Sequence, residues 1–555
     1  MNLALYSILQ SSDTAGISEY LPEAVITARS YDFRNYLDMN TPIRMHQFRN
    51  LPAPFDDTRF IVMLSGGVAP LFDALSVRGG GIADNMITIN GIPIITPHYR
   101  LLHFLPLDRD AIDYMEFYRG DMPPEYDGFL SALLKVHLTE RVYAKVGLTS
   151  ISGNLRGFHW DFFYTPIFFP KDIGMENLFA AYVREPLSTI YMRDFLRISR
   201  DIRISEGDTL KYLLKDNQTW GASIEGKFLH MYVSHESRFL KVRTLSQGES
   251  ISTSDRTVAG IHAKYREWGA GLQFHRYIFH PDDEEYYNLL NMSKTCFSIS
   301  MYRRWGKFFS AGLTYFSQGK ILPLVRAGYK HFVDSTTAFR IFFGTSGQGF
   351  IPAGYPIFEK YISRDKVSMG YTLIGGMERL LPGKSFQINA FVRYFRPHYS
   401  LLFFLFPPEM GFRDSTVIFS STPILSFGMD MNYQDYEKGN LNVSLTLQRS
   451  LFTENWKPTP YDIRFVLYFQ YRYLSAMFID GIVRWDILLQ SENPYESDYR
   501  ESPMYIYSFM FPFRWKGFHF RIGVYNFIPQ IKPENELSAI YRAFPIPILN
   551  VRKYF

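Results

Sequence analysis

The chain has 555 residues, of which 46% are hydrophobic, 17% aromatic and 20% charged. So high an aromatic share excludes an intrinsically disordered chain, because disordered segments are poor in aromatic residues. The net charge of +5 is spread along the sequence without a block of Lys or Arg, so nucleic acid is not expected as a partner.

The first 141 residues predict a short leading segment and one compact domain. Met1–Gly16 contains no Lys or Arg, so the charged start of a secretory signal peptide is not evident. Residues 1–20 are expected to form a flexible lead-in. Residues 21–141 consist of short apolar runs interrupted by Pro and Gly, a texture typical of a compact α+β domain.

From residue 142 to Phe555 the sequence alternates between apolar and polar residues. In one such run Phe309, Ala311 and Leu313 would share one face of a strand, and the small or polar residues between them the other. The runs extend over nine residues or more, whereas strands of soluble proteins average about five or six. An apolar face opposite a polar face suits a strand between lipid and a watery lumen. A soluble β-sandwich is the alternative, since its strands alternate too.

The size of this segment predicts a large transmembrane barrel. No stretch of 18 apolar residues exists, which excludes a membrane-spanning helix. Strands of about 9–11 residues, with about 9 residues in each connection, divide the segment into about 22 strands, and barrels of this size hold a plug in the lumen. We therefore expect a membrane all-β fold in which residues 142–555 form one closed antiparallel barrel. Closure requires the last segment, Tyr541–Phe555, to pair with the first, Val142–Ser150.

Five stretches within residues 21–141 follow one another in the order of a known domain. The third contains Arg78 before three glycines, followed by an Asn-Gly pair, and the fourth contains an Arg-Gly pair and ends in a Tyr-Asp-Gly turn. In this order they resemble the plug domain of TonB-dependent outer-membrane receptors. The resemblance implies an α+β plug that fills the lumen of the barrel. The stretches are Leu21–Ala28, Phe60–Val68, Leu75–Pro93, Ile112–Gly128 and Phe129–Thr139.

The resemblance assigns roles to residues of the plug. In the family, plug arginines pair with acidic residues of the barrel wall, so Arg78 and Arg119 are candidates for a plug–barrel lock, together with Glu116 on the strand before Arg119. The alternative is that these arginines are solvated or paired locally. The turns of the plug motif comprise Gly79, Gly80, Gly81, Asn90, Gly91, Gly120 and Gly128.

A short segment near the N-terminus resembles the TonB box, which the energising partner TonB grips from the periplasm. Val25, Ile26 and Thr27 favour a strand, and pairing with TonB would be β-augmentation through main-chain hydrogen bonds. The alternative is that this segment is the first strand of the plug and has no partner. Its residues are Glu23, Ala24, Val25, Ile26, Thr27 and Ala28.

The function that this resemblance implies is transport rather than catalysis. An outer-membrane receptor would bind a scarce ligand, such as an iron chelate, a cobalamin-like molecule, a glycan or a peptide, and TonB would supply the energy for uptake. The residues reveal neither the ligand nor a catalytic cluster, and no cofactor or metal is expected; the lone Cys296 excludes a cysteine-based zinc cluster. The alternative is a plug-and-barrel protein without transport, which acts as a surface scaffold or joins a surface lipoprotein in an uptake complex.

Overall fold

The computed structural model describes most of the chain from residue 43 to residue 555. The segment Glu23–Ala28, which resembles the TonB box, lies outside the described residues. Among those described, no helix is long and apolar enough to cross a membrane. The described residues are 43–53, 57–71, 74–80, 85–94, 107–121, 123, 125–148, 150–155, 157–164, 175–185, 188–205, 208–244, 248–266, 268–281, 292–305, 307–316, 320–348, 367–396, 423–435, 439–452, 457–458, 462–471, 473–484, 501–527 and 545–555.

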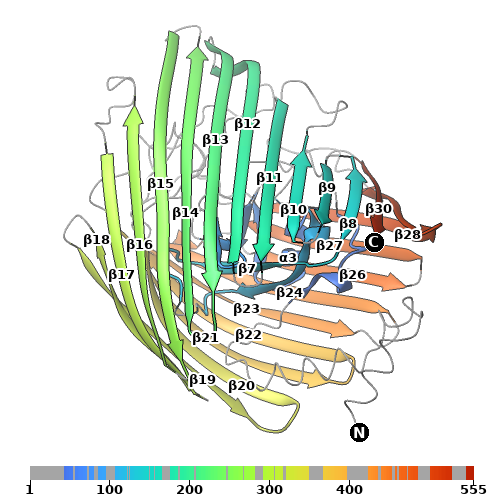
Figure 1. Ribbon diagram of the computed structural model, residues 1–555. Coiled ribbons are helices and arrows are strands. Elements are labelled where there is room, and N and C mark those ends of the chain that lie inside the picture. Colours follow the sequence, from blue (N-terminus) through green and yellow to red (C-terminus); the bar gives the residue numbers. More distant parts are fainter. Residues whose placement is uncertain are drawn as a thin grey trace.

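The larger part of the chain forms a closed antiparallel barrel of 22 strands, as the alternating sequence predicts (Figure 1). Its strands, with the additional two-residue β25, are β8 (Tyr143–Gly147), β9 (Ser150–Leu155), β10 (Phe158–Phe163), β11 (Met175–Glu185), β12 (Ser188–Ser205), β13 (Asp208–Glu225), β14 (Leu229–Thr244), β15 (Gly248–Tyr265), β16 (Trp268–Pro281), β17 (Met292–Trp305), β18 (Lys307–Phe316), β19 (Ile321–Phe332), β20 (Thr337–Gln348), β21 (Ser368–Leu381), β22 (Lys384–Arg396), β23 (Ile424–Asp435), β24 (Asn440–Phe452), β25 (Lys457–Pro458), β26 (Asp462–Tyr471), β27 (Leu474–Arg484), β28 (Glu501–Trp515), β29 (Phe518–Tyr525) and β30 (Ile546–Tyr554). The ring closes where β30 pairs with β8, from Tyr554 opposite Tyr143 to Asn550 opposite Gly147. The last strand therefore pairs with the first, as closure requires.

The two ends of the barrel differ in the length of the connections between strands. At one end, which we call the short-turn end, each connection spans one to four residues, such as 266–267 and 516–517. At the other, the long-loop end, several are far longer, including 349–367 and 397–423. The long strands β12 to β15 stand above their neighbours in Figure 1. The chain enters β8 and leaves β30 at the short-turn end.

The outer surface of the barrel is apolar. On β18, Phe309 and Leu313 are 54% and 56% exposed, whereas Thr314 is 1% exposed and faces the lumen. This arrangement excludes a soluble sandwich, in which the apolar face would be buried. Exposed aromatic side chains also gather near the short-turn end, a position typical of the boundary between lipid tails and head groups. They are Phe228, Tyr265, Trp268, Phe332, Tyr471, Tyr473, Trp515 and Phe518.

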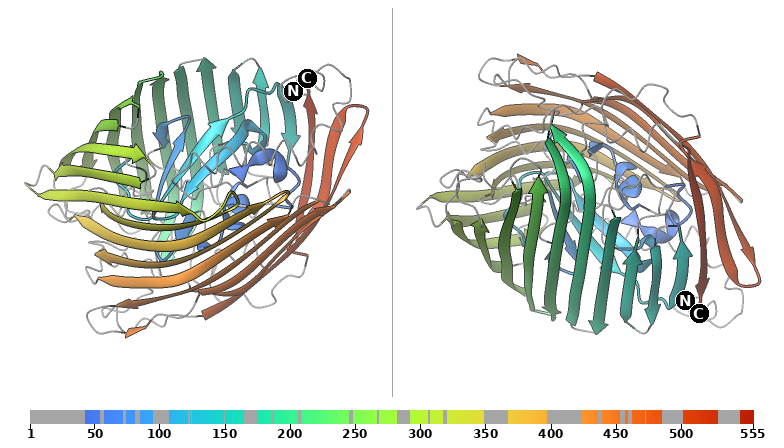
Figure 2. Two further views of the ribbon diagram at one scale, coloured as in Figure 1. Left: turned by 90° about the horizontal axis from the view of Figure 1, so that it is seen from below. Right: turned by 90° about the horizontal axis from the view of Figure 1, so that it is seen from above.

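The N-terminal domain lies inside the ring of barrel strands and is called the plug below (Figure 2). Its described elements are β1 (Ile43–Arg44), η2 (Met45–Gln47), α3 (Arg59–Met63), β2 (Val68–Leu71), β3 (Ala74–Val77), β4 (Asn85–Ile89), β5 (Ile92–Ile94), η5 (Arg109–Ala111), β6 (Ile112–Tyr118) and β7 (Ala132–Leu138). Five strands form one mixed sheet in the order β1–β6–β7–β4–β5, in which β4 and β7 are parallel. β2 and β3 form a separate hairpin.

One face of the plug sheet is apolar and packs against the barrel wall. Side chains alternate along each strand, so Met115 of β6 and Val136 of β7, which are register partners, share this face. They belong to the main hydrophobic core, which also takes in side chains from β10 to β12 and from β26 to β30. Phe60 of α3, for example, packs edge-on against Tyr525 of β29 with ring centroids 5.2 Å apart.

The opposite face of the plug sheet is polar. Glu116 lies opposite Lys135 and Tyr114 opposite His137 in the pairing of β6 with β7. The rings of Tyr114 and His137 stack with their centroids 4.1 Å apart. The plug is therefore amphipathic, and its two faces meet different parts of the barrel wall.

Candidate functional site: the interface between plug and barrel

Asp430, in the middle of β23, joins two plug arginines to the barrel wall. Arg78 contacts Asp430 Oδ2 through Nε at 2.8 Å and Nη2 at 2.6 Å. Arg119 Nη1 lies 3.1 Å from the other oxygen, Oδ1, to which Asn389 of β22 also donates from 2.8 Å. The three charged side chains are at most 5% exposed, so their charges are paired out of contact with bulk water. We call this group the Asp430 cluster.

Arg119 stays charged at this buried position. Burial lowers the pKa of its guanidinium, the charge of Asp430 raises it, and the result is a pKa of about 10. At neutral pH the guanidinium therefore carries its proton and can hold Asp430. Its backbone N–H also donates to the carboxylate of Asp121 at 3.0 Å.

Two glycines allow the plug backbone to approach β23 closely. Gly67 and Gly79 have positive φ angles of 78° and 80°, a backbone conformation that residues with a side chain rarely adopt. A Cβ added to Gly67 would lie 3.1 Å from Asp430 Oδ2, and one added to Gly79 would clash with Ser426. Gly79 of the predicted motif is therefore required for contact with the wall, whereas Gly81 lies outside the described residues.

Two barrel arginines extend the contact to neighbouring strands. Arg340 of β20 donates to Asp121 of the plug at 2.7 Å and to Asn389 of the Asp430 cluster at 2.7 Å. Arg393 of β22 donates to the carbonyl oxygen of Leu130 at 2.6 Å. The sector β20 to β23 thus binds the plug through charged and hydrogen-bonded groups.

A second charged cluster joins the plug to the strands that close the barrel. Asp110 of η5 lies 2.6 Å from Arg552 on β30, 2.8 Å from Arg521 on β29 and 3.6 Å from Lys145 on β8. The hydroxyl of Tyr554 donates to it from 3.2 Å. Burial raises the pKa of the Asp110 carboxyl, but the three cations outweigh it and hold the pKa well below its usual range. We call this group the Asp110 cluster.

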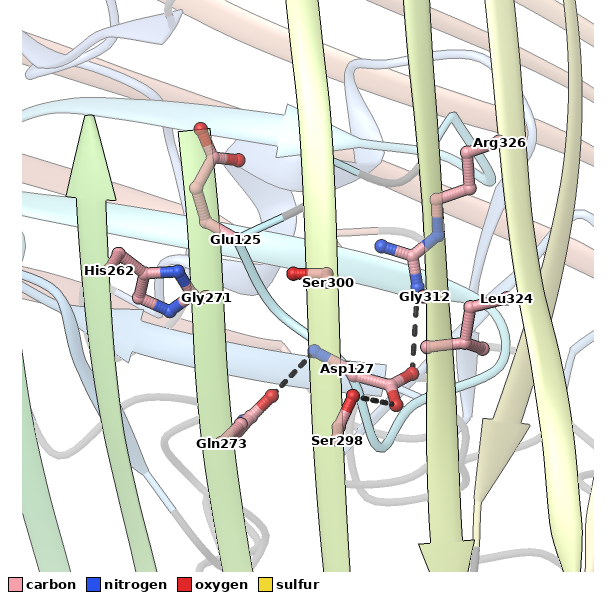
Figure 3. A pocket seen from close by; sticks show the side chains of 10 residues that line it. All are labelled: Glu125, Asp127, His262, Gly271, Gln273, Ser298, Ser300, Gly312, Leu324 and Arg326. Carbon is pink, nitrogen blue, oxygen red and sulfur yellow. Dashed lines mark hydrogen bonds and ion pairs between the residues drawn. The ribbon is translucent and has the colours of Figure 1, made fainter. Parts of the chain in front are cut away.

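A plug turn contacts the opposite wall through Asp127 (Figure 3). Its Oδ2 accepts hydrogen bonds from Ser298 at 2.9 Å and Thr314 at 2.6 Å, and Arg326 lies 3.5 Å from Oδ1. The backbone N–H of Asp127 donates to Gln273 Oε1 at 2.8 Å. This third contact, with β16 to β19, consists of polar groups alone.

A small cavity adjoins this turn. Its volume is about 10 Å³, room for about one water molecule. Plug and wall both contribute to it, and glycines at two wall positions leave the space open (Figure 3). The lining residues are Glu125, Asp127, His262, Gly271, Gln273, Ser298, Ser300, Gly312, Leu324 and Arg326.

Glu116, grouped with the two arginines from the sequence, contacts the plug rather than the wall. The Tyr118 hydroxyl donates to it at 2.8 Å, and His137 Nε2 and Lys135 Nζ lie 3.6 and 3.9 Å from its carboxylate. Burial raises the pKa of Glu116, but the nearby imidazole of His137, the charge of Lys135 and the hydrogen bond from Tyr118 outweigh it and lower the pKa to about 2. Among the described residues, the structure thus places Glu116 within the sheet and apart from Asp430.

The predicted Asn-Gly pair forms the turn between β4 and β5. Asn90 and Gly91 both have positive φ angles, 45° and 80°, which defines the two-residue hairpin turn favoured by this pair. Gly91 faces the barrel, where an added Cβ would lie 2.5 Å from Nε2 of His230 on β14. Of the other motif glycines, Gly80 packs against Ser131, and Gly120 and Gly128 have φ angles of 100° and 89°.

The sequence alone did not single out the barrel partners of the plug. Asp430 interrupts an apolar stretch between Met429 and Met431, and its inward position could be read from the alternation. Many barrel strands carry such an inward polar residue, however, and the pattern does not say which of them meets the plug. Asp110 was missed because it precedes a predicted strand without belonging to a motif.

Comparison with known proteins supports the fold. No family model matches the sequence, and no curated protein matches it. The structure is similar to the siderophore receptor PirA from Pseudomonas aeruginosa, with a TM-score of 0.62, 12% identity and coverage of 93% of this chain and 99% of that one. For PirA from Acinetobacter baumannii the TM-score is 0.65 and the identity 11%, with coverage of 95% of this chain and 99% of that one. For the copper transporter OprC the TM-score is 0.64 and the identity 10%, with coverage of 93% of this chain and 98% of that one. At these identities the likeness concerns the fold, and the predicted plug-and-barrel fold is confirmed.

Proposed function

We propose that this protein is an outer-membrane receptor that carries a scarce ligand across the barrel. One observation supports the proposal above all others: the plug lies inside a closed barrel and is bound to its wall by the buried Asp430 and Asp110 clusters. A barrel filled in this way passes a large solute only after the plug shifts, so opening is a controlled event. Siderophore receptors and a copper transporter share the fold, which favours transport over catalysis.

The length of the connections gives the direction of transport. Bacterial outer-membrane barrels have short turns in the periplasm and longer loops outside the cell. The short-turn end would therefore face the periplasm, and the long-loop end would face the medium and receive the ligand. An iron chelate is the first ligand to test, because siderophore receptors recur among the similar structures.

Energy would come from TonB through the segment Glu23–Ala28. The side chains of Val25, Ile26 and Thr27 favour an extended strand, which TonB would pair with by main-chain hydrogen bonds. Ligand binding at the long-loop end would shift the ensemble of plug conformations and release this segment. A pull on the segment would then act on the plug and break its contacts with the wall.

Growth of a deletion strain tests the proposal. The strain is grown with one limiting nutrient at a time, from a panel of ferric siderophores, copper, cobalamin, oligosaccharides and peptides. The intact chain should restore growth on one of them. A chain without Glu23–Ala28 should not, although equal amounts of folded barrel reach the outer membrane by heat-modifiability on gels.

Two results would contradict the proposal in different ways. Uptake by the chain that lacks Glu23–Ala28 would refute the role of TonB while leaving transport intact. A protein whose loss affects growth on no nutrient, but which copurifies with a surface lipoprotein, would instead be the scaffold or complex subunit of the alternative function.

A further inference from the structure

The barrel wall meets the plug in sectors of different chemistry. Side chains of β10 to β12 and β26 to β30 join the apolar core, and β20 to β23 carry the Asp430 cluster and its neighbouring arginines. The sector β14 to β19 meets the polar side of the plug sheet and the turn at Asp127 largely through polar groups, and its apolar contact is a small cluster around Tyr126 and Tyr232. Apolar packing of the first kind excludes water and resists separation, whereas water or a polar solute can replace the hydrogen bonds of the β14–β19 sector.

Glycines stand at several positions on the lumen face of the β14–β19 sector, including Gly260, Gly271 and Gly312. A Cβ on Gly260 would lie 2.7 Å from Cε1 of the Tyr232 ring, and one on Gly271 would lie 2.6 Å from Nδ1 of His262. Gly312 and Ser300 line the cavity beside the Asp127 turn. The rings of Tyr232 and His262 therefore occupy the space that side chains at positions 260 and 271 would otherwise fill.

His262 is the side chain that most directly indicates a binding position for a polar solute in this sector. It is 5% exposed, and neither of its ring nitrogens has a hydrogen-bond partner among the described residues. The hydroxyl of Tyr232 and Nε2 of His230 are buried without a partner in the same part of the chain. Buried polar groups without partners cost free energy, so a water molecule or a ligand is expected to satisfy them.

These groups form a continuous line from the cavity to the short-turn end. The ring of Tyr126, on the plug, lies 5.9 Å from that of Tyr232 and 6.0 Å from that of His262. His262 in turn lies 6.1 Å from His230, the second residue of β14 at the short-turn end. Lys135, on the polar face of the plug sheet, lies 5.3 Å from the Tyr126 ring. Tyr126 thus lies between the cavity and the short-turn end of the barrel.

We propose that this line is the exit passage for the transported ligand, running from the Asp127 turn to the short-turn end, with Tyr126 as its gate. The assignment rests on the proposed function. The passage suits a hydrophilic solute that both donates and accepts hydrogen bonds, because its walls offer imidazole, phenol and amide groups. Among the described residues, no group of three His, Cys, Asp or Glu side chains is placed to hold a metal ion.

Thiol accessibility tests the passage without any ligand or uptake. The native cysteine is removed by Cys296→Ala, and Ser298→Cys is placed in the lining of the cavity on β17, where the serine is 4% exposed. Its matched control is Ser508→Cys, on β28 in the apolar sector, where the serine is also buried. The full-length protein, folded in detergent, is treated with the small hydrophilic reagent methanethiosulfonate ethylsulfonate, and the rate of modification is followed by mass spectrometry.

The cysteine beside the passage should react about tenfold faster or more, because the one in the apolar sector reacts only when the packed interface opens. Opening the gate by Tyr126→Ala should accelerate the reaction at position 298 and leave position 508 protected. Protection at 508 also shows that the plug has stayed in place. Tyr126→Phe, which keeps the ring, should behave as the parent.

Equal rates at positions 298 and 508, or a faster reaction at 508, would overturn the passage. A rate at 298 that does not respond to Tyr126→Ala would overturn the gate, and so would the same acceleration at both positions. Tyr232→Ala, on the barrel side of the same ring stack, repeats the gate test without changing the plug. Because these measurements need no transported ligand, they can fail while growth experiments support transport, and the reverse also holds.

Discussion

Arg78 and Arg119 lie buried inside the barrel with Asp430 between them, and each contacts a different oxygen of its carboxylate. Asp430→Asn keeps the shape of the side chain but removes the charge, so two guanidinium groups would be buried without a counter-charge. Breaking a buried ion pair in this way costs about 3–5 kcal/mol. We expect the plug to unfold at markedly lower urea concentration, measured by the susceptibility of the plug to protease in the intact protein.

The matched control for this change lies on the same strand. Asp435, at the end of β23, pairs with Lys384 at 3.5 Å but is 23% exposed. Asp435→Asn should change the urea midpoint little, because exposed ion pairs contribute about 0–1 kcal/mol. Equal effects of the two substitutions would show that Asp430 does not hold the plug.

The lowered pKa of Glu116 predicts how the free energy of unfolding of the plug depends on pH. Its pKa falls from the ordinary glutamate value of 4.5 to about 2 in the folded plug. A carboxyl with a lowered pKa contributes stability that is fully present above about pH 4.5 and is lost as the pH falls toward 2. Its contribution at neutral pH is about 3 kcal/mol.

Calorimetry of the plug transition between pH 6 and pH 3 measures this contribution. Glu116→Gln should lower the transition temperature at pH 6, and the gap to the parent should narrow as the pH falls below about 4.5. The control is Asp113→Asn, an exposed carboxyl on the same strand. A gap that stays constant down to pH 3 would contradict the assignment of the lowered pKa to Glu116.

At the scale of elements, the barrel strands were predictable because their signal is local. A strand between lipid and lumen alternates with a period of two, and this pattern is complete within one strand such as β18. Neighbouring strands then pair in chain order, so the barrel follows without information from distant residues. The Asn90-Gly91 turn was readable for the same reason, because the two residues themselves fix the turn type.

The partners across the interface were not predictable, because nothing local encodes them. Arg78 and Asp430 are 352 residues apart in the sequence, and Asp110 and Arg552 are 442 apart. Which inward residue of a strand meets the plug depends on the rotation and height of the plug in the lumen. Glu116 and Arg119 show how far sequence reasoning reaches. They are three residues apart on one stretch and were assigned to the same plug–barrel contact, yet Glu116 pairs with residues of the plug sheet.

The outward face of β18 gives a prediction about a whole element. Leu313 is 56% exposed on the apolar exterior. Leu313→Arg should destabilise the barrel by about 2–4 kcal/mol if the residue lies near the bilayer midplane. The urea midpoint of barrel unfolding in lipid vesicles measures this. Thr314→Ala, on the lumen face, should cost less, since it removes only one hydrogen bond to the plug.

At the scale of the whole molecule, the two charged clusters have different mechanical roles. The barrel residues of the Asp430 cluster, Asn389 and Asp430, lie on β22 and β23, in the middle of a continuous sheet. The partners of Asp110 lie on β8, β29 and β30, where the barrel closes. The β8–β30 pairing joins only residues 143–147 with residues 550–554. The plug therefore supports the closing seam, in addition to filling the lumen.

This difference predicts that Asp110→Asn weakens the barrel itself. Without the carboxylate, the guanidinium groups of Arg521 and Arg552 would repel one another, at a cost of about 3–5 kcal/mol, whereas Lys145 keeps its 2.6 Å ion pair with Asp108. Heat-modifiability of the full-length protein on gels reports the unfolding of the barrel, so Asp110→Asn should lower the temperature of that transition. Asp430→Asn should loosen the plug but leave the transition unchanged, because its strands are paired along their whole length. The same shift for both variants, or none for Asp110→Asn, would show that the seam holds without the plug.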